Sequence, residues 1–326
     1  MNNLFFIFGG IFALGLGADI IVRSSINLAK LYRVSGYFIG FTVIALGTSL
    51  PEFAATLQAL NVVNSLGIAL GNIIGSNIAN ILLILGIISF INPIIFSNKK
   101  GQKNQTLMVL VITVVATGIF YILTNFQNVN STIFGVILIF IFLFFLYSQY
   151  KNESLNDYQN SESPKFSQFI SYILLILGII LLYFGSKYFI IGSEKIAYSY
   201  GISESIIGLT LVAFGTSLPE LSAGVVAAFK KQTNLAVGTI LGSNIYNIVG
   251  IFAVIIFMNS DSFPSGSNIL LINILIMTLI TFIFVFKIRF GVGFLNIKPF
   301  HLGKRSGLFF LILYAIYIFY NYLKII

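Results

Sequence analysis

Ten apolar runs, each about as long as a helix needs to cross a bilayer, follow one another along this 326-residue chain. They cover roughly residues 3–24, 36–60, 67–91, 105–125, 131–149, 168–191, 204–229, 235–259, 267–287 and 307–323. About 20 apolar residues in helical form span the ~30 Å hydrocarbon core. Only 8% of the residues are charged, whereas a soluble domain carries about 25%. The sequence therefore predicts an all-α polytopic membrane protein with ten transmembrane helices. A β-barrel would show short alternating segments instead.

One stretch of the second run returns almost unchanged in the seventh. Residues 40–52 read GFTVIALGTSLPE and residues 208–220 read GLTLVAFGTSLPE, so every difference exchanges one apolar residue for another. A second motif is repeated as well: residues 71–81 read GNIIGSNIANI and residues 238–248 read GTILGSNIYNI. Two motifs that recur in the same order indicate an internal repeat.

The repeat divides the chain into two halves of five helices each. The first half covers residues 1–149, a polar linker covers residues 150–167, and the second half covers residues 168–326. Because five is an odd number, the halves must enter the membrane from opposite sides, as inverted repeats. Most of the 18 Lys and Arg residues lie in loops after the odd-numbered runs, and such residues collect in cytoplasmic loops. We therefore expect a cytoplasmic linker and two extracellular termini, and we attribute the net charge of +9 to membrane orientation and not to nucleic-acid binding.

Two of the nine acidic residues, Glu52 and Glu220, lie deep inside apolar runs at equivalent repeat positions. A charge at the bilayer centre costs at least ~2.5–3.5 kcal/mol on insertion scales, so such residues usually have a function. Each follows a proline, which removes a helical N–H and displaces the carbonyl one turn earlier. Carbonyls freed at membrane depth must line a cavity or bind something, and those of Ala45 and Ala213 are candidates. The alternatives are a protonated glutamate bonded between helices and a proline kink that serves packing alone.

Further oxygen-bearing side chains share helix faces with these glutamates or with one another. In each half a threonine precedes the glutamate by one turn, and a serine precedes an asparagine by one turn in the second motif. These residues are Thr48, Thr216, Ser76, Asn80, Ser243 and Asn247. Off these faces lie Ser49, Ser217, Asn77 and Asn244.

All of these side chains offer oxygen, which hard cations such as Ca²⁺ and Na⁺ prefer. The chain has no cysteine, so thiolate metal sites and disulfides are excluded. Hydrogen bonding between helices is the alternative role for the serines and asparagines. For the glycines at positions 71, 75, 238 and 242 we expect close helix packing.

The paired motifs resemble the α-repeats of the sodium/calcium exchanger family, within the cation/Ca²⁺ antiporter superfamily. The resemblance covers nearly the whole chain, as in prokaryotic members with ten helices, inverted halves and a short linker. It implies a secondary active antiporter that exchanges Na⁺ for Ca²⁺ by alternating access, both ions competing for one site at the membrane midplane. The resemblance carries ion-binding roles to Glu52, Glu220, Thr48, Thr216, Ser49, Ser217, Ser76, Ser243, Asn80, Asn247 and the carbonyls of Ala45 and Ala213, with Glu52, Glu220, Thr48 and Thr216 as metal ligands.

Asn247 departs from some members of the family. Certain prokaryotic relatives carry Asp there, so this chain has Asn in both halves and two ionisable groups in place of three. One Ca²⁺ would neutralise their formal charge of −2, whereas three Na⁺, the family's usual number, would leave +1. Exchange would then move net charge across the membrane. The resemblance also implies that the first and sixth helices move together against the others.

Other functions stay open on the sequence alone. Two buried glutamates could bind protons in place of Na⁺, because burial favours the protonated form of a carboxyl group, so H⁺/Ca²⁺ exchange, or exchange of another cation, is the nearest alternative. An intramembrane aspartyl protease would need two aspartates at matching depth, which the sequence lacks. A cation channel would show a pore loop or a symmetric oligomer. We expect a transporter and not an enzyme, in a prokaryotic plasma membrane, with lipid, Ca²⁺ and Na⁺ (or H⁺) as partners and without a cofactor or an obligate protein partner.

Overall fold

The computed structural model describes residues 2–61, 65–95, 100–126, 129–152, 164–199, 213–259, 268–290 and 301–323. Most of the expected linker and the first part of the seventh apolar run lie outside these ranges. Within them the secondary structure is helical, apart from a short ribbon. In that ribbon β1 (Ile94–Ile95) pairs antiparallel with β2 (His301–Leu302).

The helices follow one another in the order of the apolar runs. They are α1 (Asn2–Tyr32), α2 (Gly36–Ile39), α3 (Ala45–Thr48), α4 (Leu50–Asn61), α5 (Leu66–Ala79), α6 (Leu85–Ile91), α7 (Lys100–Asn125), α8 (Ser131–Asn152), α9 (Gln168–Ser199), α11 (Ala213–Thr216), α12 (Leu218–Phe229), α13 (Thr233–Ile245), α14 (Phe252–Met258), α15 (Asn268–Phe290) and α16 (Lys304–Leu323). Three π-helical turns join some of them: η1 (Gly40–Ile44), η2 (Asn80–Ile84) and η5 (Tyr246–Ile251).

Among the residues that the structure describes, eight continuous stretches are long and apolar enough to cross a membrane. Two further apolar helices are α12, which is shorter, and the 20-residue α16. The described chain thus holds eight to ten apolar helices of the predicted all-helical class. The number ten is not settled, because the run that contains α12 begins outside the described residues.

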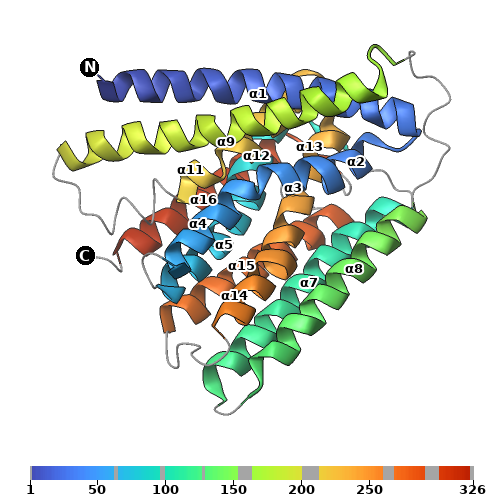
Figure 1. The fold of residues 1–326 in the computed structure, drawn as a ribbon. Helices are drawn as coiled ribbons and strands as arrows, with labels where there is room; N and C mark the ends of the chain where they lie inside the picture. Colours follow the sequence, from blue (N-terminus) through green and yellow to red (C-terminus); the bar gives the residue numbers. More distant parts are fainter. Residues whose placement is uncertain are drawn as a thin grey trace.

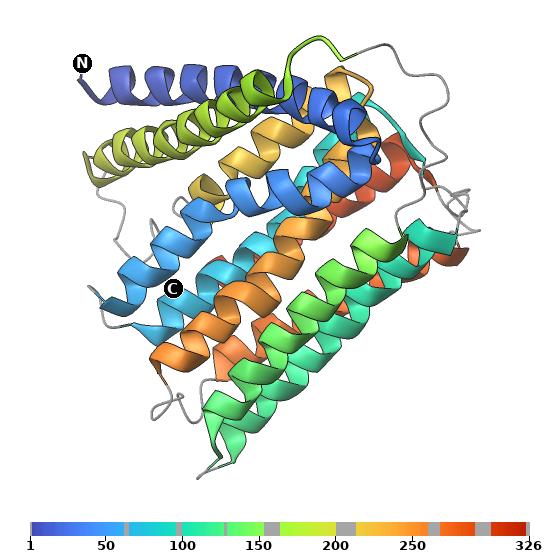
Figure 2. The ribbon, with the colours of Figure 1, turned by 45° about the vertical axis from the view of Figure 1, so that its right-hand side comes forward.

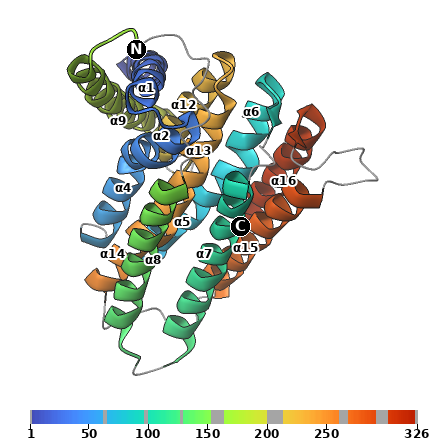
Figure 3. The same ribbon diagram turned by 90° about the vertical axis from the view of Figure 1, so that its right-hand side faces the viewer.

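The helices form layers with α1 and α9 at one side of the molecule (Figure 1). These two run side by side, and the view turned by 45° shows the same pairing (Figure 2). A Cβ atom added to Gly10 would lie 2.7 Å from the carbonyl oxygen of Gly185, so the two backbones touch. The hairpin of α7 and α8 lies at the opposite side, with α5, α13 and α14 between the two pairs (Figure 3).

The first helix is longer than the sequence predicts, since α1 continues past residue 24 to Tyr32. Two polar residues near this end of the helix, Ser24 and Asn27, are buried and hydrogen-bonded inside the protein. Ser24 donates to the carbonyl of Ile20 at 2.9 Å, and the amide of Asn27 donates to the Ser171 hydroxyl on α9 at 2.7 Å. The drop in hydropathy after residue 24 therefore marks a polar contact between helices and not the end of the helix.

The distribution of polarity is that of a membrane protein, with an apolar outside and a polar centre. Large apolar residues are widely exposed, among them Phe5 at 77%, Phe12 at 73% and Phe169 at 72%. By contrast, the side chains of Glu52 and Glu220 are 0% exposed. A surface this apolar suits contact with lipid chains and not with water.

Both glutamate motifs interrupt their helices. Residues 36–61 form one apolar span, but Ser49 within it has φ −81° and ψ 2°, outside the helical range. Ser217 has nearly the same backbone angles, φ −86° and ψ 4°. A proline follows two residues after each serine and cannot donate the helical hydrogen bond. The breaks expected from proline and glycine therefore lie directly beside the glutamates.

Candidate ion-binding site

Each of the two glutamates lies in the first turn of the helix that begins after the break. Glu52 belongs to α4 and Glu220 to α12. Peptide N–H groups at a helix start carry partial positive charge and favour a nearby carboxylate. The local sequence therefore places each acid at the N-terminal end of a helix.

Serines from opposite halves of the sequence bring the two glutamates into one cluster. The Ser49 hydroxyl donates to Oε1 of Glu220 at 3.4 Å, and the Ser217 hydroxyl donates to Oε1 of Glu52, also at 3.4 Å. A helical wheel places these serines off the glutamate face. The non-helical backbone at each break turns the serine toward the glutamate of the other repeat.

Ser243 and Thr48, two further residues of the predicted site, also lie at Glu220 or beside it. Ser243 on α13 donates to Glu220 Oε1 at 3.1 Å, and its hydroxyl lies 3.3 Å from that of Thr48. Thr48 also donates to the carbonyl of Ala45 at 3.4 Å. The predicted Ala45 carbonyl therefore lies within the cluster, among hydroxyl groups.

The side of Glu52 is built differently, through a residue that the sequence did not single out. Asn72 on α5 donates to the carbonyl of Glu52 at 3.0 Å and to the hydroxyl of Thr56 at 3.1 Å. Its oxygen accepts from the hydroxyl of Thr216 at 3.3 Å. The equivalent position in the second half is Thr239, whose hydroxyl donates to the carbonyl of Leu235 on its own helix. The signal in the sequence was this difference between the two repeats, Asn72 in one and Thr239 in the other. Ala213, predicted to offer a carbonyl, begins α11.

Five oxygen atoms of the two repeated motifs are buried and lack a hydrogen-bond partner among the described residues. These buried atoms are Glu52 Oε2, Glu220 Oε2, Ser76 Oγ, Asn80 Oδ1 and Asn247 Oδ1. Buried polar atoms are almost always partnered, so a set of unpartnered oxygens needs an explanation. A hard cation takes six to eight oxygen ligands of this kind. The donor set therefore fits such an ion, with two carboxylates and neutral oxygens around them.

Glycine lets two helices approach closely enough to bring these residues together. A Cβ atom on Gly238 would lie 2.2 Å from the carbonyl oxygen of Tyr37, and one on Gly242 would lie 2.4 Å from that of Phe41. The predicted close packing is confirmed at these two positions. It is wrong for Gly71, around which an added Cβ atom would meet nothing within 4 Å.

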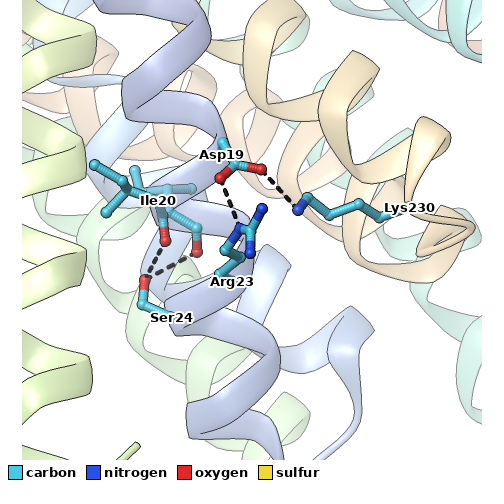
Figure 4. A network of polar contacts seen from close by, with 6 residues as sticks. Asp19, Ile20, Arg23, Ser24 and Lys230 are labelled. Carbon is cyan, nitrogen blue, oxygen red and sulfur yellow. Dashed lines mark hydrogen bonds and ion pairs between the residues drawn. The ribbon is translucent and has the colours of Figure 1, made fainter. Parts of the chain in front are cut away.

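A second group of charges lies apart from this cluster, on α1 (Figure 4). Asp19 accepts from Arg23 Nε at 2.6 Å on its own helix. Its other oxygen pairs with Lys230, which directly follows α12, at 2.7 Å. Each of these side chains is partly exposed. The pairs balance charges within α1 and connect α1 to the end of α12.

Comparison with known families gives a match along most of the chain. The sequence profile of the sodium/calcium exchanger protein family matches residues 2–151 and 170–323. The chain belongs to the sodium/calcium exchanger family. The resemblance seen in the motifs is therefore confirmed, and this exchanger is an integral membrane transporter for cations and Ca²⁺.

Relatives of known sequence and structure agree with this assignment. The uncharacterized membrane protein MJ0091 of Methanocaldococcus jannaschii is 36% identical over 94% of this exchanger and 95% of its own length. The sodium/calcium exchanger MaX1 of Methanosarcina acetivorans is 29% identical, over 76% and 80% of the two chains. A structure of the sodium-calcium exchanger NCX_Mj soaked with Na⁺ and Ca²⁺ matches with a TM-score of 0.81 and 33% identity, covering 98% of both chains.

Proposed function

We propose that this exchanger moves Ca²⁺ against Na⁺ across a membrane, and that both ions compete for one site between Glu52 and Glu220. The observation that supports the proposal is the set of buried oxygens in the two repeated motifs, those of Glu52 and Glu220 among them, that lack a hydrogen-bond partner among the described residues. If these oxygens served packing alone, several of them would stay buried without a hydrogen bond, at a cost of about 1–3 kcal/mol each. An ion that binds them removes that cost.

The proposed ligands come from both repeats of both motifs. They are Glu52, Glu220, Thr48, Thr216, Ser49, Ser217, Ser76, Ser243, Asn80, Asn247 and the carbonyls of Ala45 and Ala213. Of these, the two glutamates supply the charge and the others supply neutral oxygen. Among the described residues no group of three or more His, Cys, Asp or Glu side chains could hold a metal. Carboxylate, carbonyl, hydroxyl and amide oxygens together form the ligand type that hard cations prefer.

The burial of the two carboxylates also explains why exchange would be coupled. Two like charges without a counter-ion in a low-dielectric interior are strongly unfavourable. A conformational change that seals an empty site would have to accept that cost, whereas a site that holds Ca²⁺ or Na⁺ would not. Each passage across the membrane would then require a bound cation, which makes the two fluxes alternate.

Uptake of ⁴⁵Ca²⁺ into proteoliposomes tests the proposed exchange. Vesicles loaded with Na⁺ and diluted into Na⁺-free buffer should accumulate Ca²⁺, and vesicles with an outward K⁺ gradient should not. A Ca²⁺ flux that follows a pH gradient and ignores Na⁺ would identify an H⁺/Ca²⁺ exchanger instead.

Charge variants of the two glutamates provide the matched comparison. Glu52→Gln and Glu220→Gln should each abolish Na⁺-driven uptake, because one ionised group cannot balance Ca²⁺. Glu194→Gln, on α9 and outside the cluster, should retain it. Equal activity of all three variants would remove the two glutamates from the site.

We further propose that the two halves are inverted, with a cytoplasmic linker and extracellular termini. The reciprocal bonds of Ser49 to Glu220 and of Ser217 to Glu52 support a two-fold relation between the halves. Because the chain has no cysteine, a single Asn160→Cys variant gives a clean label position in the linker. A membrane-impermeant maleimide should label it only after intact cells are opened. Labelling of intact cells would reverse the proposed orientation.

A further inference from the structure

Four asparagine amides form a connected chain of hydrogen bonds beside the proposed ion site. Asn80 Nδ2 donates to Asn244 Oδ1 at 2.9 Å, and Asn244 Nδ2 donates to the backbone carbonyl of Asn77 at 3.4 Å. Asn247 Nδ2 donates to Asn77 Oδ1 at 3.2 Å, and Asn77 Nδ2 points to the sulfur of Met277 at 3.6 Å. All five side chains are buried.

The orientation of an asparagine amide decides what it offers to an ion. Its oxygen attracts a cation, whereas its NH₂ group carries positive partial charge and repels one. For Asn80 and Asn247, the unpartnered atom in the described structure is the oxygen in each case. The bonds made by the two NH₂ groups therefore determine whether the site is attractive or repulsive.

A backbone carbonyl fixes the orientation of Asn80. The carbonyl oxygen of Asn77 can only accept a hydrogen bond, so Asn244 must turn its NH₂ group toward it. The oxygen of Asn244 then faces Asn80 and requires an NH₂ group in return. Only the oxygen of Asn80 remains to face the site.

A thioether fixes the orientation of Asn247 in the same manner. The sulfur of Met277 accepts weakly and cannot donate, so Asn77 turns its NH₂ group toward it. The oxygen of Asn77 then receives the NH₂ group of Asn247. Met277 lies on α15, outside both repeated motifs, and is 2% exposed.

We propose that Asn77, Asn244 and Met277 are positioning residues, which hold the amides of Asn80 and Asn247 with their oxygens toward the cation. The inference rests on the proposed ion site. A thioether is a weaker acceptor than a backbone carbonyl, so the orientation of Asn247 depends on the weaker of the two fixed ends. A carboxylate at position 247 would need no such support, because both of its ends are oxygen.

The test is a double-mutant cycle between Met277→Leu and Asn247→Asp, read as Ca²⁺ affinity of the purified protein. Leu has a similar volume but accepts no hydrogen bond, so Met277→Leu should weaken Ca²⁺ binding about 3- to 10-fold when residue 247 is Asn. In the Asn247→Asp background the same change should alter affinity less than about twofold. The control Met108→Leu, on α7 and away from the amides, should have no effect in either background.

A purely structural role for Met277 predicts a different result, namely the same loss of affinity in both backgrounds, and that result overturns the inference. Unchanged affinity of Met277→Leu with Asn247 present overturns it as well. If the wild-type protein binds neither Ca²⁺ nor Na⁺, the proposed function fails and the inference with it.

A second pair of variants at Asn77 keeps the test independent of Met277. Asn77→Asp retains an oxygen for the NH₂ group of Asn247 and should bind Ca²⁺ within about threefold of wild type or more tightly, whereas Asn77→Leu should bind at least about tenfold more weakly. Equal losses in both Asn77 variants would contradict the positioning role.

Discussion

At the scale of single residues, the site depends on oxygens that are held in place by neighbours which bind no ion themselves. Asn72 is the clearest case, because it holds the carbonyl of Glu52, the hydroxyl of Thr56 and the hydroxyl of Thr216 at once. A single side chain therefore connects α4, α5 and α11 behind the first glutamate.

Replacing Asn72 by Leu should lower stability measurably. The change leaves buried polar groups without partners, at a cost of about 1–3 kcal/mol. Thermal unfolding of the detergent-solubilised protein should show a lower Tm than wild type. The equivalent change in the second half, Thr239→Val, removes only a bond within one helix and should shift the Tm less. A larger shift for Thr239→Val would contradict the role given to Asn72.

Helical spacing in the sequence indicated some of the contacts around the glutamates, but not those that form where the helices break. Thr48 and Ser243, chosen for their positions one turn before Glu52 and Asn247, lie 3.3 Å apart through their hydroxyl groups. Ser49 and Ser217 bond to the glutamates although a helical wheel places them on another face. The sequence could not predict this, because the backbone angles at a helix break cannot be read from composition. Contacts between helices, such as that of Asn77 with Met277, depend on tertiary packing and have no local signal.

At the scale of helices, glycine sets how closely α13 approaches η1. Gly238 and Gly71 occupy equivalent repeat positions, yet only Gly238 lies against the backbone of another helix. Hydropathy and repeat alignment treat the two alike, so the sequence could not distinguish them. The difference arises from which neighbour each helix meets.

Gly238→Ala should therefore be far more damaging than Gly71→Ala. A methyl group at Gly238 would lie 2.2 Å from the Tyr37 carbonyl and force the helices apart, which typically costs 1–3 kcal/mol or more. The Gly238→Ala variant should lose Ca²⁺ binding and folded yield, while Gly71→Ala should match wild type or be slightly more stable, since Ala favours helix. Gel-filtration profiles and Tm values measure both. Equal behaviour of the two variants would show that this helix contact is not needed.

The charged group on α1 gives a second prediction at this scale. Asp19 holds two cations, so Asp19→Asn leaves both Arg23 and Lys230 without their partner, whereas Lys230→Met removes only one pair. Exposed pairs contribute about 0–1 kcal/mol each. Lys230→Met should thus change the Tm little, and Asp19→Asn should lower it more. A larger drop in Tm for Lys230→Met would mean that Lys230 stabilises the protein through contacts other than its pair with Asp19.

At the scale of the whole molecule, the fold class and the family followed from the apolar runs and the two motifs. The length of α1 did not, because buried polar residues such as Asn27 resemble a helix end in a hydropathy scan. The inversion of the halves and the moving role of α1 and α9 stay predictions. These two helices lie side by side at one face of the molecule (Figure 1).

Two carboxylates give the proposed site a formal charge of −2, so the site is neutral with one Ca²⁺ and carries +1 with three Na⁺. Exchange of three Na⁺ for one Ca²⁺ should therefore be electrogenic. Each net charge moved through 100 mV contributes ~2.3 kcal/mol, which corresponds to about a 50-fold change in the ion ratio at which net flux stops. Proteoliposomes clamped at different potentials with K⁺ and valinomycin should show this shift. A reversal point that is independent of voltage would establish an electroneutral ratio.

The central claim is that Glu52 and Glu220 share one cage for hard cations, and locating the ion tests it most directly. Crystals soaked with Sr²⁺, which has the ligand preferences of Ca²⁺ and scatters anomalously, should show a peak between the two carboxyl groups. The peak should lie roughly 2.3–2.8 Å from oxygens of both glutamates and fade as Na⁺ is added. An anomalous peak confined to other parts of the chain, or carboxyl groups that stay empty at saturating Sr²⁺, would contradict the account.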